Sequence, residues 1–202
     1  MLSFDPKNHT EREIYKLMIG TIVPRPIAFV TSVAKDGTIN GAPFSYFNSV
    51  APKPPLISIS VNRKNGVQKD TARNIVEQKQ YVIHIVDEDN VEQINKTAAS
   101  LPADESEINQ AELTLAPSEV IQTPGIKEAK VRLECVLEKH IELGEDGETA
   151  TDFIIGKIVR IHLDPSIYND GKIIYDELKA VSRLAGNDYA KMGDVFTIKR
   201  PK

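Results

Sequence analysis

Residues 131–163 read VRLECVLEKHIELGEDGETATDFIIGKIVRIHL, and this stretch decides the fold. Apolar and polar residues alternate through its first half and again through its second half. The apolar positions are Val131, Leu133, Cys135, Leu137, Phe153, Ile155, Val159, Ile161 and Leu163. Alternation with a period of two is typical of a half-buried β-strand, and the Asp146-Gly147 dipeptide between the halves favours a tight turn. The stretch therefore predicts a long β-hairpin.

Shorter strands are predicted on the N-terminal side of this hairpin. The Asp36-Gly37 dipeptide marks a second turn, and Ile57 and Ile59 alternate with serine residues. The predicted strands cover Ile27–Val33, Ile39–Tyr46, Leu56–Val61 and Tyr81–Val86. Many strands of this period with few helices predict a mainly β fold, an antiparallel barrel. A closed barrel also removes exposed sheet edges.

Three short helices are predicted outside the strands. Thr10–Ile19 begins with the Thr-x-x-Glu spacing of a capping box and can end at Gly20. A second helix covers Lys69–Gln78, and Asp89 is placed to cap a third. Residues 100–125 are polar, acidic and dotted with proline, so we expect a surface excursion there.

The composition is that of an ordinary globular domain. The 202 residues suffice for a single domain over 1–202 and are too few for two large ones. The formal net charge of −4 argues against a general attraction to nucleic acid or anionic lipid. A single cysteine, no signal-peptide pattern and no long apolar run lead us to expect a cytoplasmic protein without a membrane span.

The sequence carries no recognisable metal or nucleophile motif. The four histidines, His9, His84, His140 and His162, fit no close ligand pattern, and Cys135 alone cannot build a thiolate site. His84 lies inside an apolar strand and is expected to be a core residue, whereas His140 and His162 are expected to be solvated. Cys135 falls on the apolar face of its strand, so we expect a buried, unreactive thiol. No GxSxG elbow, Walker loop or GxGxxG fingerprint is present.

Two segments have compositions that could serve a ligand. Residues 42–55 read APFSYFNSVAPKPP and combine flat apolar side chains with hydroxyl and amide groups, as a planar heterocycle with polar edges needs. Composition alone favours the simpler interpretation, a strand that ends in a proline-rich loop. Residues 69–75 read KDTARNI and open a helix, whose free N–H groups suit a phosphate. The simpler alternative there is an ordinary cap by Asp70 with solvated charges.

Taken together, these segments resemble the flavin reductase-like family of the flavoredoxin type, which has an FMN-binding split barrel. The matching stretches are PRPIAFVTS at 24–32, NGAPFSYFNSVAPKPPLISIS at 40–60, KDTARNI at 69–75 and SRLAGNDY at 182–189. Their order and spacing also fit, so the resemblance covers most of the chain. It implies a split antiparallel barrel with a few peripheral helices.

The resemblance also implies a set of side chains around FMN. Those near the isoalloxazine ring would be Thr31, Ser32, Ser45, Tyr46, Phe47 and Asn48. Ser60 would face the ribityl chain, while Lys69, Asp70 and Thr71 would surround the phosphate with help from Arg63. Arg183 and Tyr189 would close the site from the same or a partner subunit. The family is typically dimeric, so the resemblance implies a homodimer with FMN near the interface.

The implied chemistry is that of the cofactor, with no catalytic side chain. NADH or NADPH would reduce the flavin, which would then pass electrons to a small-molecule or protein acceptor. Two alternatives stay open: an FMN-carrying electron-transfer protein that a protein partner reduces, and a non-catalytic cofactor-binding barrel. If NADH or NADPH reduces the flavin, the protein is an FMN-dependent NAD(P)H oxidoreductase.

Overall fold

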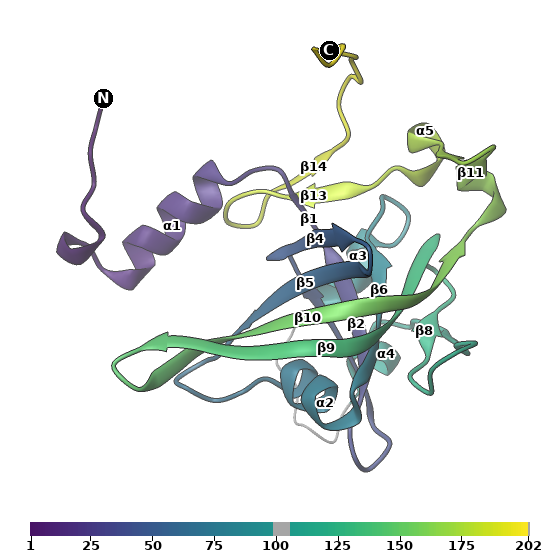
Figure 1. Cartoon of the computed structure of the whole chain (residues 1–202), viewed down its shortest axis with the longest axis horizontal. Helices are drawn as coiled ribbons and strands as arrows, with labels where there is room; N and C mark the ends of the chain where they lie inside the picture. Colours follow the sequence, from purple (N-terminus) through teal and green to yellow (C-terminus); the bar gives the residue numbers. More distant parts are fainter. Residues whose placement is uncertain (99–105, 202) are drawn as a thin grey trace.

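The computed structural model describes residues 1–98 and 106–201, and an antiparallel sheet dominates this part of the chain (Figure 1). Within the described residues the main sheet has seven strands in the order β3-β2-β6-β9-β10-β5-β4. In that order they are Ile39–Phe44, Ala28–Val33, Gln80–Ile85, Val131–Glu145, Glu148–Leu163, Pro55–Asn62 and Phe47–Pro52. Every neighbouring pair is antiparallel. The expected mainly β fold is confirmed.

The sheet is curled but does not close by hydrogen bonds. Its two edge strands, β3 and β4, follow one another in the chain and are joined only by Ser45 and Tyr46. The edges must therefore approach each other at this corner, where Ser60 N donates to Tyr46 O at 2.9 Å. The strand predicted over Ile39–Tyr46 ends at Phe44, because the chain turns at Ser45 from one edge of the sheet to the other.

The predicted hairpin is present as β9 and β10, with 15 and 16 residues. Asp146 and Gly147 in its turn have φ values of 53° and 83°, the left-handed backbone that an Asp-Gly hairpin turn requires. Its far end projects beyond the rest of the sheet (Figure 1). The hairpin crosses the centre of the sheet, since β9 pairs with β6 and β10 pairs with β5.

The two longer predicted helices are present. Helix α1, Glu11–Thr21, carries the expected capping box and continues past Gly20; it lies apart from the main sheet (Figure 1) and buries only Ile19. Helix α2, Asp70–Gln78, packs Ala72 and Ile75 into the core. Helix α3, Val91–Lys96, begins after Asn90 and not after Asp89 as expected, because the Asp89 carboxylate is bonded to Lys130 Nζ at 2.6 Å.

The described part of the expected surface excursion contributes to the core instead. Residues 100–105 lie outside the described chain, but 106–125 contain α4 (Glu107–Gln110) and β7 (Leu115–Ala116), and β8 (Gly125–Ile126) follows. Ile108 and Leu113 join a second apolar cluster built on Phe29, beside the main cluster inside the sheet. The acidic and proline-rich composition conceals these few buried apolar positions.

The remaining elements are short. Strands β1, β13 and β14 form a separate three-stranded sheet. None of the described helices is long and apolar enough to span a membrane. The short strands are β1 (Arg25–Pro26), β11 (Tyr168–Asn169), β12 (Lys172–Ile173), β13 (Val181–Arg183) and β14 (Tyr189–Lys191). The short helices are η1 (Pro6–Asn8), η2 (Pro165–Ile167) and α5 (Tyr175–Leu178).

Candidate functional site

A groove runs along the free edge of β3, where the sheet does not close. It consists of two adjoining cavities of about 500 Å³ and 170 Å³ that share Pro43, Phe44 and Ala98. The larger cavity lies between β3 and the start of α2, and the smaller one lies between the end of β3 and β13–β14. We call these two adjoining cavities together the β3 groove. It is lined by Asn40, Pro43, Phe44, Ser45, Lys69, Asp70, Thr71, Arg183 and Tyr189, among others.

One end of the β3 groove meets the N-terminus of α2. The cap residue Lys69 has extended backbone, and no side chain caps the first N–H groups of the helix. The alternative in which Asp70 caps the helix is not seen, because Asp70 pairs with Arg73 at 2.5 Å. Thr71 is buried, and its Oγ1 accepts a hydrogen bond from Asn40 Nδ2 at 2.8 Å. The arrangement leaves backbone N–H groups and one hydroxyl proton available to an anion.

The other end of the groove is formed by the β3–β4 corner and the C-terminal strands. Ser45 lines it from the corner, and Arg183 and Tyr189 line it from β13 and β14. The Arg183 guanidinium lies 4.4 Å from the centroid of the Tyr189 ring, in the range of a cation–π contact. Tyr189 Oη donates to Asn95 Oδ1 at 2.8 Å, which attaches the C-terminal strands to α3.

Two expected site residues are interior to the fold. Thr31 and Ser32 are fully buried on β2. The Thr31 hydroxyl donates to the carbonyl of Pro124 at 2.7 Å, and the Ser32 hydroxyl accepts from Asn74 Nδ2 at 3.3 Å. Their hydroxyl groups therefore bond to the protein, and neither residue lines the β3 groove.

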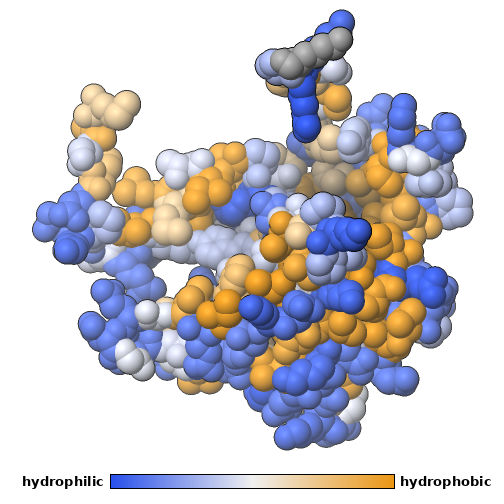
Figure 2. Space-filling model, viewed as in Figure 1, coloured by the Kyte–Doolittle hydropathy of each residue, from blue (hydrophilic) through white to orange (hydrophobic). Residues whose placement is uncertain are grey.

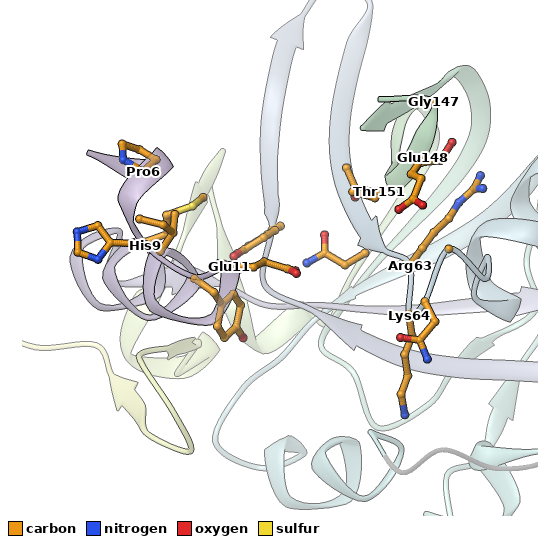
Figure 3. Close-up of a pocket in the computed structure, with 17 residues that line it drawn as sticks. Pro6, His9, Glu11, Arg63, Lys64, Gly147, Glu148 and Thr151 are labelled. Atoms are coloured by element: carbon orange, nitrogen blue, oxygen red, sulfur yellow. The ribbon is translucent and has the colours of Figure 1, made fainter. Parts of the chain in front are cut away.

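Other expected residues lie on the far side of the corner. Tyr46 and Arg63 line a cleft of about 1390 Å³ between α1 and the hairpin (Figure 3), and Figure 2 shows this hollow at the surface. Phe47 packs against the main core from β4. Asn48 is exposed on the same strand, with Oδ1 bound to Ser49 N at 2.8 Å. Ser60, on β5, is half-buried opposite Phe153.

The Arg63 side chain belongs to an ion-pair network on the hairpin. It donates to both carboxylate oxygens of Asp152, at 2.9 Å and 2.7 Å, and lies 3.1 Å from Glu142. His140 Nε2 is 2.8 Å from the same Asp152 carboxylate. The expectation that His140 is solvated is therefore wrong. Burial alone would raise the pKa of Asp152, but the hydrogen bonds from Arg63, His140 and Gln68 lower it below its ordinary value. Arg63 thus contacts both carboxylates of this network and balances one of their two negative charges.

The remaining histidine and cysteine predictions have clear outcomes. His84 is a fully buried core residue, as expected: Nδ1 is 3.0 Å from the carbonyl of Phe29, and Nε2 accepts from Ile126 N at 3.0 Å. Burial lowers its pKa to about 3. His162 is not solvated, since its Nε2 is 2.6 Å from Glu134. Cys135 is buried as expected, and burial raises its thiol pKa well above the ordinary value.

Several groove residues were missed in the sequence, among them Asn40, Phe44 and Glu107. Asn40 and Phe44 are the second and sixth residues of β3 and stand in the matched stretch 40–60, so the period of two places both on the same face of the strand. Glu107 gave no such signal, because it lies among other acidic residues. It lines the groove beside Thr71, and its Oε2 accepts from Gly41 N at 3.4 Å.

Comparison with known proteins identifies the fold. The chain is 54% identical to component B of nitrilotriacetate monooxygenase from Bacillus cereus, with 98% of each chain covered and a TM-score of 0.97. It is 30% identical to 2-nitrobenzoate 2-nitroreductase NbaA from Pseudomonas fluorescens, covering 99% of this chain and 96% of that one, with a TM-score of 0.89. A protein with a split barrel domain from Shewanella frigidimarina NCIMB 400 is 20% identical over the whole of both chains, with a TM-score of 0.85.

The last of these likenesses confirms the expected split barrel. At family level, residues 19–178 match the flavin reductase like domain, which covers every strand of the main sheet and the start of α2. The chain therefore belongs to the flavin reductase-like family.

Proposed function

We propose that the β3 groove binds FMN and that the protein is an NAD(P)H-dependent oxidoreductase of the flavin reductase type, passing electrons to a small acceptor. The observation that carries this proposal is that the two cavities of the β3 groove share Pro43, Phe44 and Ala98. The groove joins an uncapped helix N-terminus at Lys69–Thr71 to a flat apolar wall at Phe44 and a polar corner at Ser45. A phosphate needs the first of these surroundings, and a planar ring with polar edges needs the other two.

The residues present fit such a cofactor. The phosphate would be held by backbone N–H groups at the start of α2 and by Thr71, with Lys69 as a positive neighbour and Asp70 turned to Arg73. The ring would lie on Phe44 and Pro43 between Ser45 and the Arg183–Tyr189 pair. In this arrangement Thr31, Ser32, Phe47 and Ser60 support the walls of the site from behind. Bound FMN would supply the hydride-accepting centre of the reaction.

The chain itself orients and shields, with no side chain acting as nucleophile or base. Ser45 has a hydroxyl at the ring end, and the Arg183 guanidinium provides positive charge near the same end. Both would favour negative charge on a reduced ring. Tyr189, held by Asn95, covers the entrance beside them and limits access of water.

We propose further that the protein is a homodimer and that the second copy fills the cleft between α1 and the hairpin. Helix α1 buries only Ile19 against its own chain, and apolar side chains stay exposed on both α1 and the hairpin. They include Tyr15 and Met18 on α1 and Ile141 and Leu143 on the hairpin. Exposed apolar patches of this kind mark interaction surfaces. Sedimentation equilibrium tests the proposal, and a monomer at micromolar concentration would contradict it.

A titration of purified protein with FMN and riboflavin tests the groove. Replacing Lys69 and Thr71 with alanine is expected to weaken FMN binding at least tenfold and riboflavin binding little, since only FMN carries the phosphate. Lys139→Ala on the hairpin is the control. Equal losses for both ligands would count against the phosphate assignment.

Anaerobic addition of NADH or NADPH then tests the reaction. Bleaching of the flavin absorption supports the NAD(P)H-dependent activity. Colour that persists with both nucleotides favours the alternative of an electron-transfer protein reduced by a protein partner. Protein that binds no flavin at all leaves only the non-catalytic barrel.

A further inference from the structure

Arg25 is a buried cation beside the β3 groove that joins three distant segments of the chain. Its Nη1 donates to the carbonyls of Ile19 at 2.7 Å and Ile22 at 2.6 Å, at the end of α1. Its Nη2 donates to the carbonyl of Leu184 at 2.8 Å, just after β13, and Nε lies 3.5 Å from Ser45 Oγ. Only 6% of Arg25 is exposed. The planar guanidinium suits this role because its donors point in fixed directions.

The charge of Arg25 has no counter-ion in the part of the chain that the structure describes. All of its hydrogen-bond partners there are neutral oxygens, and it takes part in none of the ion pairs. The carbonyls of Ile19 and Ile22 belong to the negative end of the α1 dipole and offset part of the desolvation cost. The rest of the field acts on the β3–β4 corner, because the side chain that Arg25 contacts by a hydrogen bond is Ser45. Burial raises the pKa of the neighbouring Tyr46, and the charge of Arg25 opposes this larger effect by lowering it. A buried ion without an opposite charge is costly, so a purpose beyond stability is needed to explain it.

We propose that Arg25 is a positioning residue for the ring end of the β3 groove. It fixes Ser45 relative to the turn between β13 and β14 and places a permanent positive charge behind the ring. The carbonyl of Leu184 that it binds immediately follows Arg183, so the same contact sets where the Arg183–Tyr189 pair stands. This inference rests on the proposed flavin site, but its structural half can be measured without a ligand.

The orientation of the Ser45 hydroxyl follows from the same contact. With Arg25 Nε–H directed at Ser45 Oγ, the oxygen serves as an acceptor on that side. Its own proton is then left to be donated into the groove. A neighbouring positive charge strengthens such a donor. Ser45 would thus donate to the polar edge of the ring, and more strongly when that edge becomes negative on reduction.

Amide hydrogen exchange of the ligand-free protein tests the positioning role. In Arg25→Met, exchange at residues 45–47 and 183–189 is expected to accelerate about tenfold or more, while β9 and β10 stay protected. Unchanged exchange in those two segments would overturn the proposal. If Arg25→Met does not fold, Arg25→Lys serves instead, because one ammonium cannot span the carbonyls of both Ile22 and Leu184.

Glu134→Gln is the matched control for a general loss of stability. Glu134 is also a buried ion, 1% exposed, that accepts from three backbone N–H groups, those of Glu119, Val120 and Ile121. It does not line the groove. The Glu134→Gln substitution is expected to lower the unfolding midpoint without accelerating amide exchange at residues 45–47 or 183–189. The same acceleration in this control would reduce Arg25 to a structural role and refute the inference.

Flavin binding and the midpoint potential of bound FMN provide the second measurement. Arg25→Met is expected to weaken FMN and riboflavin binding equally, about tenfold, and to lower the midpoint potential, since a positive charge behind the reduced ring is lost. Glu134→Gln is expected to change neither. Unaltered affinity and potential in Arg25→Met would refute the ring-end role. A wild-type protein that binds no flavin would instead refute the proposed function, and the exchange result would still decide whether Arg25 positions the groove.

Discussion

Glu107→Gln is expected to tighten FMN binding about fivefold at pH 8 and to leave riboflavin binding unchanged. Glu107 is the first residue of α4 and is half-buried in the larger cavity of the β3 groove, beside the start of α2. Its carboxylate accepts from Gly41 N at 3.4 Å, a bond that the glutamine oxygen can also accept. The substitution therefore removes one negative charge near the proposed phosphate position and keeps the local geometry.

The magnitude follows from the size of the cavity. A volume of about 500 Å³ is roughly 10 Å across, so Glu107 and a bound phosphate would be separated by about 8 Å or less, where two unit charges in water interact by roughly 0.5 kcal/mol. The phosphate of FMN carries about 1.5 to 2 negative charges at neutral pH. Removing Glu107 should therefore contribute about 1 kcal/mol, or roughly fivefold in affinity, at low salt. The gain should shrink as the ionic strength rises.

The pH dependence of FMN binding is a second test of the direction in which Glu107→Gln changes the affinity. Burial raises the pKa of Glu107, and the charge of Asp70 raises it further. Below this raised pKa the wild-type side chain is neutral, like glutamine, so the two proteins should bind FMN with similar affinity. As the pH rises through the pKa, wild-type Glu107 becomes charged and its FMN affinity should fall behind that of the variant. Free FMN titrates in the same way in both experiments, so the ratio of the two affinities reports the charge of Glu107 together with its effect on the bound phosphate.

Fluorescence titrations of FMN and riboflavin between pH 5 and 8 measure these quantities. Glu145→Gln, at the exposed end of the hairpin, is the control and should bind both ligands as wild type does. Weaker FMN binding by Glu107→Gln, or an equal gain for riboflavin, would mean that the phosphate does not lie at this end of the groove.

Three further predictions concern the core. Gly156→Ala places a Cβ 1.9 Å from Tyr81 Oη and should lower the free energy of unfolding by about 1–3 kcal/mol in urea titrations, whereas Tyr81→Phe should not, because that buried hydroxyl has no hydrogen-bond partner among the described residues. His84 has a pKa of about 3 in the folded protein, against an ordinary value of 6.5. Because the unfolded chain binds the extra proton, the free energy of unfolding should decline by up to roughly 4 kcal/mol as the pH falls from 6.5 towards 3. A free energy of unfolding that stays constant over that range would contradict this. Iodoacetamide should modify Cys135 only after unfolding, as mass spectrometry would show.

The parts of the fold that could be predicted are those whose signals are local. The hairpin over 131–163 was predictable because each residue's face follows from alternation and the turn from Asp146-Gly147. The α1 capping box was predictable for the same reason. Residues 106–125 were not, since their few buried side chains, such as Ile108, find their partners on β2, far away in the sequence. The average polarity of such a segment does not indicate which of its residues contact a strand that is distant in the sequence.

In the candidate site, too, the residues that could be predicted are those whose position depends on local features. Lys69, Asp70 and Thr71 could be placed together because a helix N-terminus is a local feature. The stretch Ser45–Asn48 could not be resolved residue by residue. The chain turns there from one sheet edge to the other, so Ser45 lines the groove while Tyr46 faces the cleft on the other side of the corner. Which side each residue takes depends on how the whole sheet curls.

The free edge of β3 explains why the barrel stays split and why a groove exists at all. Along this edge, the carbonyl of Ile39 accepts from Ser106 Oγ at 2.6 Å, and the N–H of Gly41 is directed at Glu107. The next residue with the same orientation is Pro43, which has no N–H to offer. Side chains from the α4 segment and a proline thus take the positions that a neighbouring strand would need, and proline is tolerated in a sheet chiefly at such an edge. Because β4 cannot pair here, the space between β3, α2 and the C-terminal strands is left for a ligand.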